Sequence, residues 1–155
     1  MYQQNQESVL NTDEILSNIK QFRMSITNKI WFGVRIFFAL FMLMGGAQHF
    51  IKPDFYLPFV PSFLPFPMAI IYLSGIVEVA LGVFLLFAKY ARIAATGIFI
   101  LMLLFLPVHI WDIISDTPAI GSHKAALIRL PFQFLFLAIA WKIKQVSSPV
   151  MSKLW

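Results

Sequence analysis

The sequence predicts an all-α protein, a four-helix transmembrane bundle with an N-terminal amphipathic interfacial helix. Four apolar runs are each long enough to cross the hydrocarbon core of a bilayer, which takes about 20 helical residues. They occupy residues 31–50, 67–88, 93–115 and 125–143. Hydrophobic residues make up 59% of the chain and charged residues 12%, a more apolar composition than that of soluble domains. With 155 residues and four spans, little chain remains for a separate soluble domain.

Residues 1–29 precede the first run and form the predicted cytoplasmic N-terminal segment. Apolar residues recur there at helical spacing, namely Ile15, Ile19, Phe22 and Ile26. Lys20 and Arg23 lie beside this stripe or at its edge. A basic amphipathic helix next to a span is typical of a helix that lies on the membrane surface. The alternative is an ordinary helix that packs on the bundle.

Basic residues are distributed unevenly between the two predicted sides of the membrane. One side collects Lys20, Arg23, Lys29, Lys89, Arg92, Lys142, Lys144 and Lys153, whereas the other has Lys52, Lys124 and the nearby Arg129. The positive-inside rule therefore places both termini in the cytoplasm. We expect a multi-pass protein of the bacterial cytoplasmic (inner) membrane, with a membrane domain at 30–144 and a cytoplasmic tail at 145–155. Topology explains the net charge of +5, and no nucleic-acid partner is expected.

The loops between the spans differ in character. Residues 51–66 contain four prolines with aromatic residues between them, which predicts a short helical turn near 53–57 and then an irregular segment. These aromatic side chains are expected to form either an interfacial belt or a lid over a ligand site. The very short loop near 89–92 forces an antiparallel hairpin, and the loop near 116–124 is polar.

Polar side chains inside the spans are the candidate ligand-binding residues, because such groups are costly in lipid and usually face the bundle interior. They are His49, Glu78, His109, Asp112, Arg129 and Gln133. Helical spacing predicts two faces of polar and small residues, one with Arg35, Ala39, Met42, Gly46 and His49, the other with Ser74, Gly75, Glu78 and Gly82. Small residues let helices approach closely, so we expect an interior seam, with the polar groups converging in the outer half of the bundle.

Each candidate also has a structural interpretation. Glu78 is either a structural partner of Arg129 or Gln133, or a carboxylate that handles protons or binds a ligand. Asp112 and Arg129 are spaced to form an ion pair. The two span histidines match no recognised metal-ligand motif. No phosphate loop, dinucleotide fingerprint or nucleophile elbow is present, so no catalytic residue is assigned, and the absence of cysteine excludes thiol chemistry within this chain.

Several short motifs occur in an order that resembles the DoxX family of small four-span membrane proteins. They are Gly46-Ala47-Gln48-His49-Phe50, Ser74-Gly75-Ile76-Val77-Glu78, Pro107-Val108-His109 and Arg129-Leu130-Pro131-Phe132-Gln133. The resemblance covers about residues 35–141. The DoxX family is grouped with the DoxD-type and MauE-type proteins. The resemblance implies a four-helix bundle and a loose association with quinone-linked or thiol-linked redox systems, and it implies no particular activity.

The resulting hypothesis is a redox-associated membrane subunit or small binding protein, more plausibly a non-catalytic component than an enzyme. A lipid-soluble ligand such as a quinone would enter between the spans with its polar head near the candidate residues. The expected partners are the lipid bilayer, a membrane redox protein and further copies of the chain. Two alternatives stay open: a structural or assembly protein, and a small proton-coupled transporter, for which no inverted repeat is evident.

Overall fold

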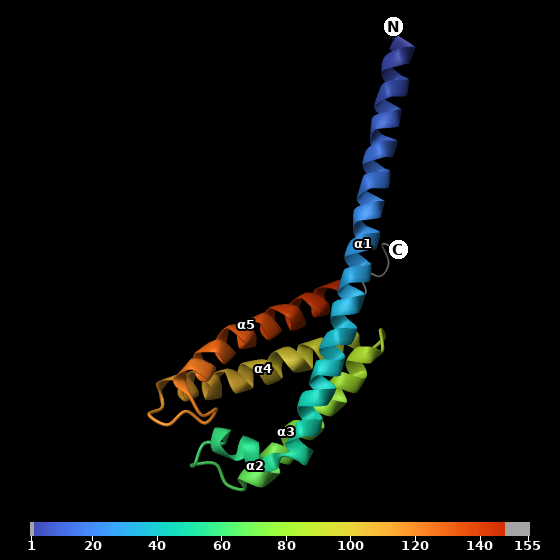
Figure 1. The fold of residues 1–155 in the computed structure, drawn as a ribbon. Helices are drawn as coiled ribbons and strands as arrows, with labels where there is room; N and C mark the ends of the chain where they lie inside the picture. Colours follow the sequence, from blue (N-terminus) through green and yellow to red (C-terminus); the bar gives the residue numbers. More distant parts are fainter. Residues whose placement is uncertain (1, 148–155) are drawn as a thin grey trace. The chain divides into compact units, whose positions relative to one another are not determined.

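The computed structural model describes residues 2–147 of the chain, and this range is helical with no strand (Figure 1). Its elements in chain order are α1 (Tyr2–Ile51), α2 (Pro53–Tyr56), the 3-10 helix η1 (Leu57–Phe59), α3 (Pro67–Leu86), α4 (Ala91–Ile114) and α5 (His123–Val146). Four of these helices are long and apolar enough to cross a membrane. The predicted all-α, four-span architecture is confirmed. Most of the predicted tail, including Lys153, lies outside the described residues.

The chain divides into two compact units, residues 1–34 and 35–155. In the first unit the predicted amphipathic segment is helical and belongs to α1, the same helix that contains the first span. Its apolar stripe is exposed, at Ile15, Ile19, Phe22 and Ile26. Contact of this stripe with a membrane surface stays a prediction.

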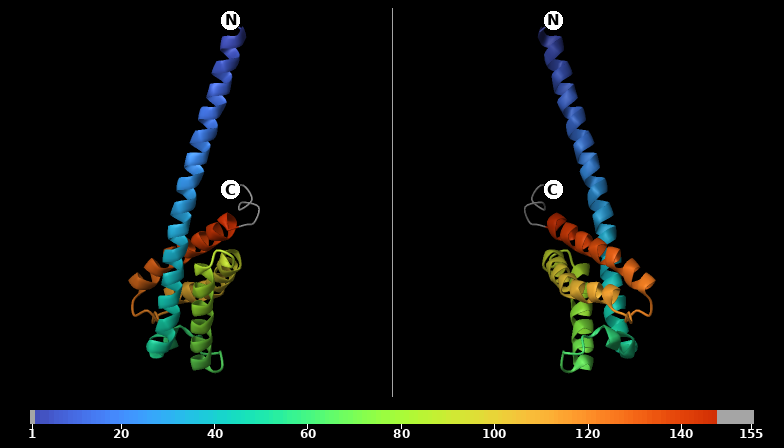
Figure 2. Two further views of the ribbon diagram at one scale, coloured as in Figure 1. Left: turned by 90° about the vertical axis from the view of Figure 1, so that its right-hand side faces the viewer. Right: turned by 90° about the vertical axis from the view of Figure 1, so that its left-hand side faces the viewer.

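In the second unit, α4 and α5 form an antiparallel pair and α3 packs against α4 (Figures 1 and 2). Three contacts fix the antiparallel register. Asp112 pairs with Arg129, the Gln133 amide reaches the Met102 carbonyl, and the Phe99 ring contacts Trp141 with centroids 5.5 Å apart. The start of α5 therefore lies beside the end of α4, and the end of α5 lies beside the start of α4.

The part of α1 from Arg35 onward packs on α3 through glycines, as the predicted seam requires. A Cβ atom on Gly75 would lie 2.7 Å from the Cβ of His49 and 2.9 Å from the carbonyl oxygen of Gly46. A Cβ atom on Gly46 would lie 2.8 Å from the Gly75 carbonyl oxygen. The two backbones are thus in direct contact, which only residues without a side chain allow.

The exterior of the second unit is apolar. Only 28% of the most apolar window of each long helix is buried, and large side chains such as Phe37, Ile93 and Leu104 are exposed. The buried core is narrow and rich in alanine, with Ala39, Ala94, Ala95 and Ala140 fully buried. Continuous apolar surface of this kind is typical of helices solvated by lipid. The structure therefore supports a bilayer environment and a multi-pass membrane protein.

Candidate functional site

His49, in the last turn of α1, is buried against α3 with both ring nitrogens close to polar groups. Its Nδ1 atom lies 3.0 Å from the carbonyl oxygen of Ile71 and 3.0 Å from Oγ of Ser74. The Ser74 hydroxyl donates its only hydrogen to that same carbonyl, at 2.8 Å. A carbonyl oxygen only accepts, so we infer that Nδ1 carries a hydrogen and donates it to these two oxygens.

The other ring nitrogen of His49 faces a buried carboxyl group. Its Nε2 atom lies 3.5 Å from Oε1 of Glu78, and Glu78 is itself buried on α3. Because Nδ1 is a donor, a neutral His49 has a lone pair on Nε2, which needs a protonated Glu78 opposite it. The alternative is an imidazolium facing a carboxylate. Both arrangements hold one proton between the two groups and keep the buried pair neutral, as a low-dielectric interior favours.

Tyr56, in the first loop region, covers the His49 side of this pair. The short α2 helix turns the chain back after α1, and the Tyr56 ring stacks on His49 with centroids 3.9 Å apart and planes 23° apart. Burial raises the pKa of the Tyr56 phenol, the Glu78 carboxylate raises it further, and the Arg129 guanidinium opposes both effects. Tyr56 therefore lies within electrostatic range of both Glu78 and Arg129.

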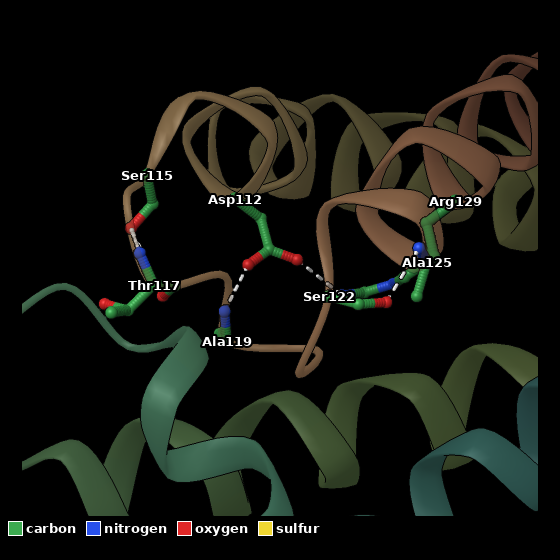
Figure 3. Close-up of polar contacts among 7 residues, drawn as sticks. All are labelled: Asp112, Ser115, Thr117, Ala119, Ser122, Ala125 and Arg129. Atoms are coloured by element: carbon green, nitrogen blue, oxygen red, sulfur yellow. Dashed lines mark hydrogen bonds and ion pairs between the residues drawn. The ribbon is translucent and has the colours of Figure 1, made fainter.

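Asp112, in the last turn of α4, is the centre of a second polar cluster (Figure 3). Its side chain is only 2% exposed. Oδ1 accepts a hydrogen bond from the backbone N–H of Ala119, and Oδ2 lies 3.2 Å from Nη1 of Arg129 on α5. Ser122 caps the start of α5 by accepting from the backbone N–H of Ala125. Asp112 thus ties the α4–α5 loop to both helices.

Arg129, Gln133 and His109 continue this cluster along the α4–α5 interface. The Arg129 guanidinium lies over the Phe59 ring of η1, 4.4 Å from its centroid, so it links the first loop to α5. The buried Gln133 amide donates to the Met102 carbonyl. His109 lies beside Arg129, Asp112 and Gln133, and its Nδ1 atom is buried without a hydrogen-bond partner.

A pocket of about 230 Å³ lies between η1 with its following loop and the end of α4. Its polar lining consists of Asp112, Ser62, Ser115 and Thr117, and its aromatic lining of Phe59 and Trp111. Trp111 is 65% exposed, so the pocket borders the apolar exterior of α4. Pockets for whole drug-sized ligands hold about 300–1,000 Å³. This one has room for a small head group, with the rest of such a molecule outside it.

The six residues predicted from the sequence form two clusters. The expected pairing of Asp112 with Arg129 is present. Glu78 pairs with His49 and not with Arg129 or Gln133, because Glu78 lies on the face of α3 that packs on α1. Arg129 and Gln133 instead contact α4. Of the six, Asp112 alone lines the pocket.

Two of the aromatic residues expected to form a belt or a lid have contacts that the sequence did not assign. Tyr56 stacks on His49, and Phe59 lies under Arg129 and lines the pocket. The available signal was Pro53, which starts a new helical turn two residues after α1 ends. A turn placed so soon after His49 brings the loop aromatics back over the end of the bundle.

Substitutions at Glu78 test the proton-sharing geometry. Glu78→Gln should change the free energy of unfolding by less than about 1 kcal/mol, because an amide N–H can donate to Nε2 of His49. Glu78→Leu should cost about 1–3 kcal/mol, because it leaves Nε2 buried without a partner. Reversible denaturation in detergent micelles measures both values. Equal losses in the two variants would contradict the proton-sharing contact between His49 and Glu78.

Comparison with known proteins gives one family match. Residues 38–144 match the model of a domain of unknown function, DUF8561. The matched segment contains both polar clusters and the whole pocket lining. No curated protein and no solved structure matches the chain.

Proposed function

This chain belongs to the DUF8561 family, and we propose that it binds a lipid-soluble molecule with a small polar head, such as a quinone. The head group occupies the pocket beside Asp112, and the protein acts as a redox-associated subunit in the bilayer. The observation that carries the proposal is the pocket itself, whose lining combines the buried carboxylate of Asp112 with the exposed Trp111. The resemblance to the DoxX family supports a redox association.

The pocket lining suits a flat ring with polar substituents. Phe59 and Trp111 supply aromatic faces, and Ser62, Ser115 and Thr117 supply hydroxyl groups. The apolar tail of the ligand lies along the outer face of α4, where Leu104 is exposed two helical turns before Trp111. A volume of about 230 Å³ admits such a head group and excludes the tail.

The His49–Glu78 pair supports a redox-active ligand over an inert one. Reduction of a quinone to a quinol takes up two electrons and two protons, and the electrons would come from a membrane redox protein as partner. His49 and Glu78 hold one proton between them inside the same unit as the pocket. The pair would supply one of the two protons, and water would supply the other.

Fluorescence titration tests the proposal, since quinones quench tryptophan emission on contact. Added decylubiquinone should quench the purified protein in detergent saturably, and Trp111→Phe should remove the saturable component. Trp141→Phe is the matched control, because Trp141 contacts Phe99 and Lys144 far along α5 from the pocket. Val108→Phe should fill the pocket and abolish binding, whereas the same substitution at Val83, an exposed residue of α3 outside the pocket lining, should retain it. Quenching that rises without saturation in every variant reports partition into the micelle and contradicts the proposal.

A structural or assembly role is the second candidate, and the satisfied hydrogen bonds of Asp112 and Gln133 favour it. In that case the polar clusters only hold helices and loops together. Arg129→Leu would then lower the melting temperature, and neither the wild type nor Val108→Phe would show saturable quenching. The same titration therefore separates the two functions.

A further inference from the structure

We propose that the end of the bundle opposite the pocket binds an anionic phospholipid, in a groove where α3 passes into α4. The groove has a volume of about 830 Å³. Its lining includes Ala88, Lys89, Arg92, Ile93, Thr96 and Gly97. It begins at two cationic side chains and continues along the exposed face of α4.

The charge at this end of the second unit is one-sided. Lys89 and Arg92 are exposed at the groove, and Lys142 and Lys144 lie near the end of α5. The acidic residues between positions 35 and 147 are Asp54, Glu78, Asp112 and Asp116. Glu78 pairs with His49 and Asp112 pairs with Arg129. Asp54 lies in α2 and Asp116 in the loop after α4, both at the pocket end. A phosphate group thus supplies the negative charge that this end of the unit lacks.

The start of α4 adds to this positive potential. Helix α4 begins at Ala91 without a capping side chain and without an acidic residue in its first turn, where Arg92 lies instead. The N-terminus of a helix carries partial positive charge, so a cation in the first turn is unfavourable unless an anion is bound nearby. A lipid phosphate between Lys89 and Arg92 pairs with both cations and also interacts favourably with the positive N-terminus of α4.

The rest of the groove distinguishes a lipid from a free phosphate. Ile93 and Ile100 are 70% and 52% exposed and lie on the same face of α4, seven residues or roughly 10 Å apart. Gly97 lies between them and also lines the groove, and the Leu81 side chain of α3 packs against it, so that a Cβ atom at position 97 would lie 2.6 Å from Leu81 Cδ2. The Thr96 hydroxyl already donates to the Arg92 carbonyl. An acyl chain can lie along this apolar strip while its head group contacts the two cations, whereas an inorganic phosphate would leave the strip uncovered.

Native mass spectrometry of the full chain, released from nanodiscs of mixed phosphatidylglycerol and phosphatidylcholine, tests the proposal. The wild type should retain phosphatidylglycerol in preference to phosphatidylcholine. The double variant Lys89→Gln with Arg92→Gln should reduce that preference at least about tenfold, given the contribution of each basic residue near an anionic lipid. The matched control, Lys142→Gln with Lys144→Gln, removes the same charge from the same end and should keep the preference.

Three results would overturn the proposal. Equal loss in the two double variants would show a diffuse charge effect with no groove. Equal retention of phosphatidylcholine by the wild type would remove the role of the lipid charge. Displacement of the lipid by inorganic phosphate or glycerol phosphate at millimolar concentration would identify a site for a free anion. Helix content by circular dichroism, expected to be unchanged in both double variants, shows that each is folded.

Discussion

Replacing Gly75 with alanine should lower the free energy of unfolding by about 1–3 kcal/mol, a large effect for one methyl group. The new Cβ atom would lie 2.7 Å from the Cβ of His49 and 2.9 Å from the Gly46 carbonyl oxygen. Both contacts involve atoms fixed close to the α1 backbone, which a side-chain rotation cannot relieve. The helices α1 and α3 must therefore separate, and the His49–Glu78 contact is stretched with them.

Gly33→Ala is the matched control for this experiment. A Cβ atom there meets nothing within 4 Å, and the position lies inside α1. Alanine favours a helix over glycine by about 1 kcal/mol, so this variant should be as stable as the wild type or more so. Denaturation of both variants in the same detergent measures the difference. A Gly75→Ala protein as stable as Gly33→Ala would show that α1 and α3 do not pack through this glycine.

Asp112→Ala is expected to have the second large effect, a loss of about 2–4 kcal/mol. The substitution leaves the backbone N–H of Ala119 without its acceptor and Arg129 without its counter-charge. The Arg129 side chain is 31% exposed, so the expected cost is below that of a fully buried pair. The α4–α5 loop, released from α4, should also become more sensitive to proteolysis.

A double-mutant cycle with Arg129→Gln separates the two roles of Asp112. The ion pair predicts that the double variant loses less stability than the sum of the single variants, because each single change leaves one charge alone. The hydrogen bond to Ala119 is lost in Asp112→Ala whatever residue occupies position 129. Additive losses would mean that the pair contributes nothing and that Asp112 acts through the loop alone.

The helices of this protein can be predicted from its sequence more directly than the contacts between those helices. Apolar runs of bilayer length marked the four spans, and Pro53 and Pro67 mark the points where helices begin. The Asp112–Arg129 pair was also predictable, because the short loop between α4 and α5 forces the end of one helix against the start of the next.

The partner of Glu78 was not predictable in the same way. Helical periodicity shows that Gly75, Glu78 and Gly82 share a face, but it does not show which helix covers that face. In the structure, α1 covers this face of α3 and contacts it through Gly46 and His49. The pocket depends on the path of the loop after Phe59. The prolines there predict that no helix continues, but they do not predict which way the chain turns.

The contact between Nδ1 of His49 and the Ile71 carbonyl limits how this histidine can move protons. A histidine that relays protons takes one up at one ring nitrogen and gives one away at the other, and this usually requires the ring to turn. Here the ring is held between the Ile71 carbonyl and the Tyr56 ring, with the Ser74 hydroxyl beside Nδ1 and Glu78 facing Nε2. A ring that cannot turn exchanges the proton on Nε2 with Glu78, so the proton that this pair shares is taken up and released on the Glu78 side of the ring.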